Sequence, residues 1–190
     1  MIAQGQAVSG VAAGSRPTLA AILFMLAYLV SFLDRQILVL MIEPIQRDLN
    51  LTDTTFSLLH GTAFALFYTI VGLFMGRIVD NHSRIRVIGW SIALWSLATT
   101  LCGLARNFTT LFVARMSVGI GEAGSSPPSH SMIADLFPLE SRGAAMGVYA
   151  AGINIGVLIG FLVGGFIDEW YGWRMAFFIV GIPGIFLGLL

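Results

Sequence analysis

Six apolar runs follow one another along the chain, each near the roughly 20 residues that a transmembrane helix needs, and short polar stretches separate them. The pattern predicts transmembrane helices over residues 18–42, 54–77, 85–104, 108–136, 143–167 and 173–190. Because proline disfavours helix before it, we expect Glu43-Pro44 to end the first helix and Ser125–Pro128 to disturb the fourth. Residues 1–17 are rich in Gly, Ala, Ser and Gln and are predicted to be a disordered tail. The last run is still apolar at Leu190, which indicates a truncated sixth helix.

The composition supports this picture and excludes several classes of protein. Of the 190 residues, 57% are hydrophobic and 11% are charged, whereas an average soluble domain has about 25% charged residues. Ten Arg balance ten Asp and Glu, so the chain has no basic surface for nucleic acid. The single cysteine, Cys102, excludes an internal disulfide and a Cys-based zinc site. We therefore predict an all-α membrane protein that needs no cofactor or metal.

Arginines in the short loops predict the orientation, because positive charge is retained on the cytoplasmic side. The tail and the loops after the second and fourth helices hold Arg16, Arg77, Arg84, Arg86 and Arg142. The other loops hold Arg47, Arg106 and Arg174, beside acidic residues. We therefore expect a multi-pass protein of the plasma (inner) membrane with a cytoplasmic N-terminus.

Four ionisable residues fall inside the predicted spans: Asp34, Arg35, Arg115 and Glu122. Each costs about 2.5–3.5 kcal/mol at the middle of a membrane, so they must be paired or face a wet cavity. Asp34 and Arg115 lie about 13 and about 12 Å from the same membrane surface, which makes an ion pair between them plausible. Glu122 follows Arg115 by two helical turns on nearly the same face.

These charges have two interpretations. They could simply staple the first and fourth helices together. Alternatively, an acid near the middle of the membrane binds and releases protons as its surroundings change, and we favour this reading. His60, Tyr149 and Asn154 are weaker candidates for a cavity lining, since packed or interhelical contacts explain such residues equally well. His130 follows the double proline and is weighed in the same way.

A glycine stripe and an internal repeat indicate how the helices pack. Gly152, Gly156, Gly160 and Gly164 recur every four residues and leave one face of the fifth helix bare for a close neighbour. The offset that maps Gly76–Asp80 onto Gly164–Asp168 also maps Asp34 onto Glu122. Three helices per repeat force opposite orientations, so the sequence predicts a three-plus-three inverted repeat.

Three segments resemble the signature motifs of the major facilitator superfamily. The loop after the second helix resembles the first motif through Gly76, Asp80 and Arg84, although Asn81, Ser83 and Ile85 depart from it. The segment Arg115-x-x-x-Gly119-x-Gly121 is similar to the second motif, and the glycine stripe to the third. The resemblance covers residues 18–190 and implies the N-terminal six-helix half of a twelve-helix transporter.

Within the superfamily, Asp34-Arg35 and the segment from Arg115 to Glu122 look most like the spinster-type branch, which exports lipids such as lysophospholipids. This resemblance implies a proton-coupled transporter that works by alternating access on an amphipathic or anionic substrate. It implies Asp34 and Glu122 as proton-coupling acids, with Arg35 and Arg115 as their partners or as ligands of a substrate head group. Gly76, Asp80 and Arg84 would serve a cytoplasmic gate. The implied partners are protons, the lipid bilayer and a C-terminal six-helix half.

Other functions remain open at this stage. A drug or organic-anion transporter of the same superfamily fits the same motifs. An intramembrane serine protease would use Ala123-Gly124-Ser125 as a nucleophile loop, but it needs a general base, and no histidine follows His130. A half-size module that works as a homodimer is a further alternative. We predict that the protein is not an enzyme.

Overall fold

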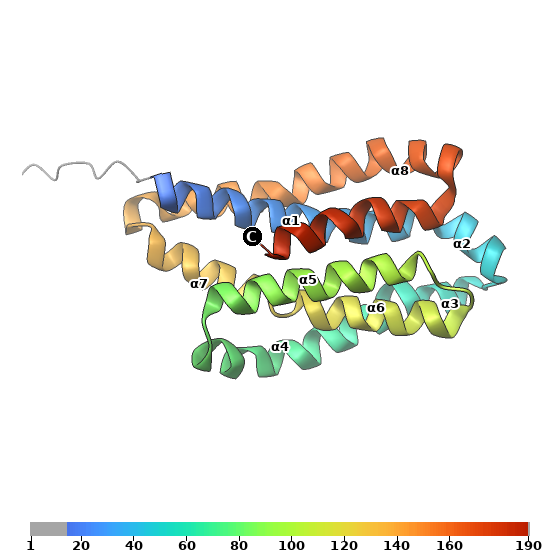
Figure 1. Ribbon diagram of the computed structural model, residues 1–190, viewed down its shortest axis with the longest axis horizontal. Helices are drawn as coiled ribbons and strands as arrows, with labels where there is room; N and C mark the ends of the chain where they lie inside the picture. The colour runs from blue at the N-terminus through green and yellow to red at the C-terminus, as the bar shows by residue number, and fades with distance from the viewer. Residues whose placement is uncertain (1–14, 190) are drawn as a thin grey trace, which may run out of the picture.

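The computed structural model describes residues 15–189, and these fold into a bundle of helices (Figure 1). In chain order the elements are α1 (Ser15–Leu40), α2 (Ile42–Leu49), α3 (Asp53–Ser57), the π-helix η1 (Leu58–Ala63), α4 (Phe64–Asn81), α5 (Arg84–Cys102), α6 (Phe108–Glu122), α7 (Ser126–Leu136) and α8 (Leu139–Leu189). No strand occurs among these residues. Residues 1–14 of the predicted tail lie outside the described part, and Ser15–Pro17 belong to the first turn of α1.

The long helices run along the length of the bundle (Figure 1). Four segments are long and apolar enough to span a membrane: Pro17–Leu40, Asp53–Asn81, Arg84–Cys102 and Leu139–Leu189. The last of these makes two passes, because Gly172 has φ 76° and folds α8 back on itself. The remaining pass consists of α6 followed by α7.

Two details differ from the predicted spans, and the predicted disturbance of the fourth span is observed. The first helix ends at Leu40, and Glu43 and Pro44 lie in the first turn of α2 instead of ending α1. Proline is tolerated there because a first-turn N–H has no helical partner. The fourth span is broken into two helices between Glu122 and Ser126. The π-helix η1 was not predicted, and it interrupts the second span.

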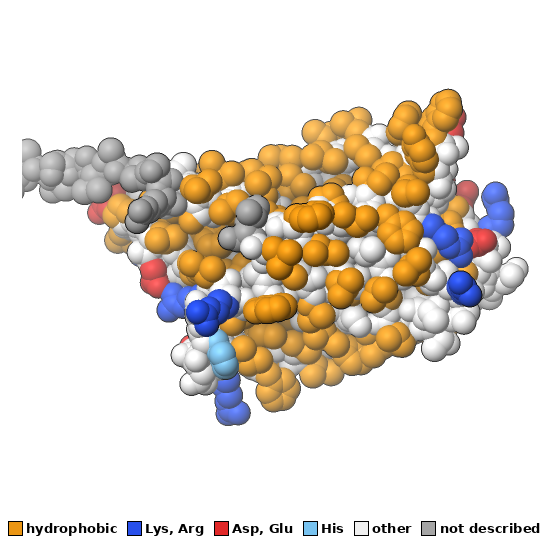
Figure 2. Space-filling model, in the orientation of Figure 1, with side chains coloured by type: hydrophobic (Ala, Val, Ile, Leu, Met, Phe, Trp, Pro, Cys, Tyr) orange, Lys and Arg blue, Asp and Glu red, His pale blue; other side chains and the backbone are white. Residues whose placement is uncertain are grey.

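The two ends of the bundle differ from its sides. We call the end with the start of α1, the α4–α5 turn and the α7–α8 turn the tail end, and the end with α2, the α5–α6 turn and Gly172 the far end. Charged side chains gather at both ends, and the flank between them is mostly apolar (Figure 2). Large side chains such as Leu73, Trp90 and Phe161 are exposed on the outside. This distribution is what a bilayer requires, since lipid is as apolar as the protein interior.

The glycine stripe of α8 lies directly against α1. A Cβ at Gly152 would lie 2.5 Å from the carbonyl oxygen of Met25, and one at Gly156 would lie 2.6 Å from that of Leu29. Farther along, a Cβ at Gly160 or Gly164 would meet the side chains of Gln36 or Leu40 at 2.8 and 2.7 Å. The missing side chains therefore let the two helices approach along about three turns. This contact fixes the rotation of α1, and with it the direction of its charged residues.

Candidate functional site

Two ion pairs join α1 to α6 near the middle of the bundle. The Arg115 guanidinium donates to Asp34 through Nη1, at 2.9 Å from Oδ2. Arg35 donates to Oε2 of Glu122 through Nη2 and through Nε, the latter at 3.1 Å. The acid of each helix is thus paired with the arginine of the other. Such a reciprocal arrangement fits two related helices that face each other across a repeat axis.

The two ion pairs differ in how far their side chains are exposed. The side chains of Asp34, Arg115 and Glu122 are each 1% exposed, whereas that of Arg35 is 31% exposed. Buried charges demand hydrogen bonds as well as charge partners. Three atoms of the cluster nevertheless have no hydrogen-bond partner among residues 15–189: Asp34 Oδ1, Arg115 Nε and Glu122 Oε1. The cluster is therefore charge-balanced but not saturated with hydrogen bonds.

Glycines on α6 bring neighbouring helices close to the charges. A Cβ at Gly119 would lie 2.8 Å from the carbonyl oxygen of Phe64, and one at Gly121 would lie 2.7 Å from the backbone nitrogen of Trp95. Since α4 and α5 both approach α6 at these positions, they exclude water from the side of Arg115 and Glu122. The second motif of the sequence thus supplies both the charges and the close packing around them.

Aromatic rings surround the accessible arginine. The Arg35 guanidinium carbon lies 4.9, 4.6 and 5.8 Å from the ring centroids of Phe32, Phe64 and Tyr68. A cation at such distances is attracted by the ring faces, more strongly where water is excluded. The sequence reasoning missed these rings. The spacing of Phe32 before Arg35 on one helix face was the available signal, but the contribution of α4 could not be read from the sequence.

The weaker candidates lie in different environments. Tyr149 is buried and stacks on Tyr28 with ring centroids 4.4 Å apart, and His130 meets its edge at 4.9 Å. His60 lies on the π-helix η1 and is exposed, and Asn154 is exposed on α8. Of the three candidates His60, Tyr149 and Asn154, only Tyr149 makes ring contacts with other aromatic side chains of the described region.

The motif between α4 and α5 lies at the tail end. Gly76 and Asp80 are exposed, and a Cβ at Gly76 would meet nothing within 4 Å. Arg84 forms an ion pair with Asp135 of α7, which the sequence reasoning did not anticipate. This pair ties the start of α5 to the end of α7. Among residues 15–189 there is no group of three or more His, Cys, Asp and Glu side chains that could hold a metal ion.

A helical bundle with an apolar outer surface and ionisable groups at its centre is typical of membrane transport proteins, in which such groups mark substrate or ion paths. Residues 24–190 match the family model described as Major Facilitator Superfamily. The chain belongs to this superfamily, and it is an integral membrane protein with the fold of the N-terminal half of a transporter. The predicted family and helical fold class are thereby confirmed. Members of the superfamily are transporters and not enzymes, in agreement with the prediction.

Similar proteins support the assignment. The chain is 32% identical over 161 residues to an MFS-type efflux pump of Mycolicibacterium smegmatis, with 85% of this chain and 38% of the pump aligned. It is 32% identical over 172 residues to a probable L-galactonate transporter of Escherichia coli, with 90% and 38% aligned. A crystal structure of a bacterial homolog of the human lysosomal transporter Spinster, inward-facing and unoccupied, superposes with a TM-score of 0.86 at 32% identity. That comparison covers 93% of this chain and 42% of the other. The chain thus spans about two fifths of the length of these proteins.

Proposed function

We propose that the protein containing this chain is a proton-coupled secondary transporter that moves an amphipathic substrate by alternating access. The observation that carries the proposal is the Arg35–Glu122 ion pair, in which the Glu122 side chain is buried and the Arg35 side chain is partly exposed. Buried acids that pair with a movable cation are suited to proton coupling, because protonation removes the reason for the pair.

Glu122 has the geometry needed to accept a proton. Both donating nitrogens of Arg35 bind Oε2, and Oε1 has no partner among the described residues. A proton on Glu122 would neutralise the carboxylate and weaken both hydrogen bonds to Arg35. The freed guanidinium could then bind a substrate head group through charge-assisted hydrogen bonds. Proton binding would in this way change the shape of the central site.

Asp34 is the second proposed coupling acid, and Arg115 its partner. Their pair is closed to the surroundings, so a proton reaches Asp34 only after Arg115 moves. We assign the protonation of Asp34 to a later step than the protonation of Glu122. In that step the contact between α1 and α6 changes as the transporter rearranges. Such a rearrangement against a second half is the usual form of alternating access.

The substrate proposal combines a polar anchor with apolar surroundings. Arg35 supplies the anchor, and Phe32, Phe64 and Tyr68 supply the apolar walls. The resemblance to spinster-type carriers favours a lysolipid-like substrate and export. The relatives include an efflux pump and a sugar-acid transporter by name, so organic anions and drugs are the second candidate class. Export against a proton gradient requires that proton and substrate compete, whereas uptake requires that they bind together.

We further propose that the tail end faces the cytoplasm of a cell whose plasma membrane holds the protein. Gly76, Asp80 and Arg84 would then lie at a cytoplasmic gate, and the Arg84–Asp135 pair would open and close with it. His60 and Asn154 are exposed positions that a second half or the substrate would cover. The arginine-rich loops at this end support the orientation.

The proposal is tested by replacing Glu122 with Gln in the full-length protein, reconstituted into liposomes with an imposed pH gradient. We expect expression to stay normal and proton-driven uptake of the tested probes to be abolished. The probes are lysophosphatidylethanolamine, galactonate and 2-naphthoate, which represent the candidate substrate classes.

The matched control is Glu140→Gln, which removes an exposed acid from the start of α8, outside the cluster. This variant should transport as the wild type does. Equal proton-driven uptake by the Glu122→Gln and Glu140→Gln proteins would exclude Glu122 from coupling.

A further inference from the structure

A continuous row of aromatic side chains leads from the tail-end half of the bundle to Arg35. His130 of α7 meets the edge of Tyr149 of α8, Tyr149 stacks on Tyr28 of α1, and Tyr28 meets Phe32 edge-on. The corresponding centroid distances are 4.9, 4.4 and 5.1 Å, and the Arg35 guanidinium carbon lies 4.9 Å from the Phe32 ring. We call these five residues the aromatic lane.

The lane follows one face of α1. Tyr28, Phe32 and Arg35 are spaced by four and three residues, so they lie on one face and span about 10 Å along the helix. Tyr149 belongs to the hydrophobic core, Tyr28 and Phe32 are half-buried and His130 is exposed, so one side of the row packs against the core and the other side is accessible in the described part of the chain. Its length suits a ligand with one polar end and a rigid apolar body of two fused rings.

The charge that a ligand meets at the end of the lane is positive. Asp34, Arg115 and Glu122 are each 1% exposed, and Arg35 alone of the cluster presents an accessible surface. An approaching molecule therefore reaches the cation of the cluster and not its acids. This asymmetry selects an anionic head group, and a guanidinium favours a planar carboxylate because two parallel hydrogen bonds can form.

Binding an anion there disturbs the charge balance of the cluster. The two acids and two arginines sum to zero, so a bound carboxylate would leave one net negative charge in a region of low dielectric. The cost disappears when Glu122 takes up one proton, because Arg35 then serves the ligand alone. Anion and proton should therefore bind cooperatively, each raising the affinity for the other.

Among residues 15–189, no other titratable group near Glu122 can take up a proton in exchange for its arginine partner in this way. The groups that face it are Asp34 and Arg35 from α1, Arg115 from α6 and Tyr68 from α4, while Cys102 of α5 and His60 of η1 lie near Arg115. Asp34 is held by Arg115, which the ligand does not reach. His130 lies at the opposite end of the lane, where its Nδ1 donates to the carbonyl oxygen of Ser126 at 2.8 Å.

We infer that the aromatic lane binds a planar aromatic carboxylate, with the carboxylate on Arg35 and the rings along Phe32 and Tyr28, and that each bound anion brings one proton onto Glu122. The inference rests on the proposed proton-coupled transport at this site, narrows the substrate to the organic-anion class, and favours uptake of the anion together with a proton over export. In this exchange the hydrogen bonds between Arg35 and Glu122 break, an O–H bond forms on Glu122 with a proton from solvent, and Arg35 binds the ligand. A carrier that binds both together moves both in the same direction.

The experiment measures binding to the full-length protein in detergent, without a pH gradient. The probes are 2-naphthoate, octanoate with the same head but a flexible body, and 2-naphthylmethanol with the same rings but no charge. Calorimetry gives the affinities, and the pH change of a weakly buffered solution gives the protons taken up. We expect 2-naphthoate to bind best, with one proton per ligand and a dissociation constant that rises about tenfold per pH unit where Glu122 is ionised.

Three variants separate the parts of the inference. Tyr28→Leu should weaken 2-naphthoate about fivefold and leave octanoate unchanged, because it removes a ring but keeps an apolar side chain. Glu122→Gln should bind 2-naphthoate with no proton uptake and no pH dependence. The control Phe112→Leu breaks an aromatic pair with Phe108 at a similar centroid distance of 5.4 Å, outside the lane, and should change neither probe.

Results other than these would refute either the binding of the ligand along the aromatic lane, the coupling of anion and proton binding, or the proposed function. Octanoate binding as tightly as 2-naphthoate, no saturable binding of 2-naphthoate, or an unchanged affinity in Tyr28→Leu refutes the lane. Proton uptake that persists in Glu122→Gln refutes the linkage. Proton-driven transport by Glu122→Gln refutes the proposed function instead, and that result is obtained in liposomes, so the two failures are distinguishable.

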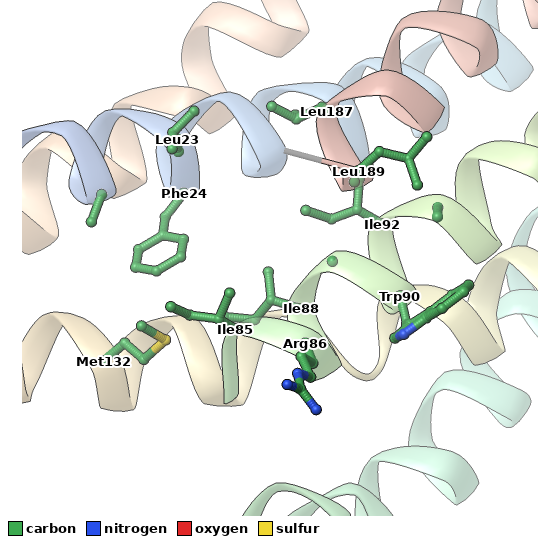
Figure 3. Close-up of a pocket in the computed structure, with 14 residues that line it drawn as sticks. Leu23, Phe24, Ile85, Arg86, Ile88, Trp90, Ile92, Met132, Leu187 and Leu189 are labelled. Carbon is green, nitrogen blue, oxygen red and sulfur yellow. The ribbon is translucent and has the colours of Figure 1, made fainter. Parts of the chain in front are cut away.

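An apolar cavity in the tail-end half of the bundle carries no comparable inference. It has a volume of about 460 Å³ and is lined by side chains of α1, α5, α7 and the last turn of α8 (Figure 3). Phe24, Ile88 and Met132 lie around it, and Arg86 and Trp90 lie along one side. Nothing in the structure shows what covers it.

Discussion

Asp34 and Arg35 are neighbours in the sequence, but they enter two ion pairs of opposite character. Asp34 meets Arg115 in a pair that is closed on both sides, and Arg35 meets Glu122 in a pair that is open on the arginine side. Successive residues of a helix point about 100° apart, so one faces the interior of the helix cluster and the other faces the aromatic rings. The closed pair is suited to holding α1 on α6, and the open pair to exchanging partners.

The difference in exposure predicts different energetic roles. Removing one partner of a fully buried pair leaves an uncompensated charge, which is far more costly than the pair's own net contribution. In the open pair, the remaining group can recruit water, a ligand or a proton. The closed pair should therefore control stability, while the open pair should control pH dependence and binding.

The largest effect is expected from Asp34→Asn. This change leaves the Arg115 guanidinium buried with no counter-charge, and we expect the free energy of unfolding to fall by about 3–5 kcal/mol. Chemical denaturation in detergent, followed by circular dichroism, measures the loss. The double variant Asp34→Leu/Arg115→Leu should recover most of it, since both charges are gone. A single variant no less stable than the double variant would show that the pair is not closed in solution.

A smaller effect is expected from Arg35→Gln, which leaves Glu122 without its partner. We expect a loss of about 1.5–3 kcal/mol, the range for hydrogen bonds to charged groups. Because a protonated Glu122 needs no cation, the loss should be greatest at high pH and shrink as the pH falls. Unfolding curves recorded at several pH values check the trend. A loss that is independent of pH would contradict the assignment of Glu122 as the group that exchanges a proton.

The sequence predicted the charged residues of this site but not that they form one buried ion pair and one partly exposed ion pair. Hydropathy located the spans, and helical depth placed Asp34 level with Arg115, because both depend on local periodicity. The openness of Arg35 depends on Phe64 and Tyr68 from another helix, which no local pattern encodes. The π-helix before Phe64 was likewise not predicted, whereas the reversal of α8 at Gly172 lies in the loop predicted between residues 167 and 173.

The glycine stripe offers a way to disturb both pairs at once. Gly156→Leu would drive a side chain into the backbone of α1, since even its Cβ would lie 2.6 Å from the carbonyl oxygen of Leu29. We expect a loss of about 1–3 kcal/mol from overpacking, together with a rotation or shift of α1 that opens the closed pair. Thermal unfolding measures the first effect, and hydrogen exchange of α1 amides measures the second. Gly165→Leu is the control, because a Cβ there meets nothing within 4 Å.

The smallest effect is expected at the far end, where Asp48 and Arg174 form an ion pair with side chains 44% and 41% exposed. Asp48→Asn should reduce the free energy of unfolding by only about 0.2–1 kcal/mol, as for other exposed pairs. Arg174 keeps its place in the variant, because Nη2 also donates to the carbonyl oxygen of Ala105 at 3.0 Å and the guanidinium stacks on Trp173. Salt screens exposed pairs but not buried ones, so high salt should remove the effect of Asp48→Asn and leave that of Asp34→Asn unchanged. Unfolding of both variants at low and high salt makes the comparison, and an equal response to salt would mean that the central pair is as accessible as the one at the surface.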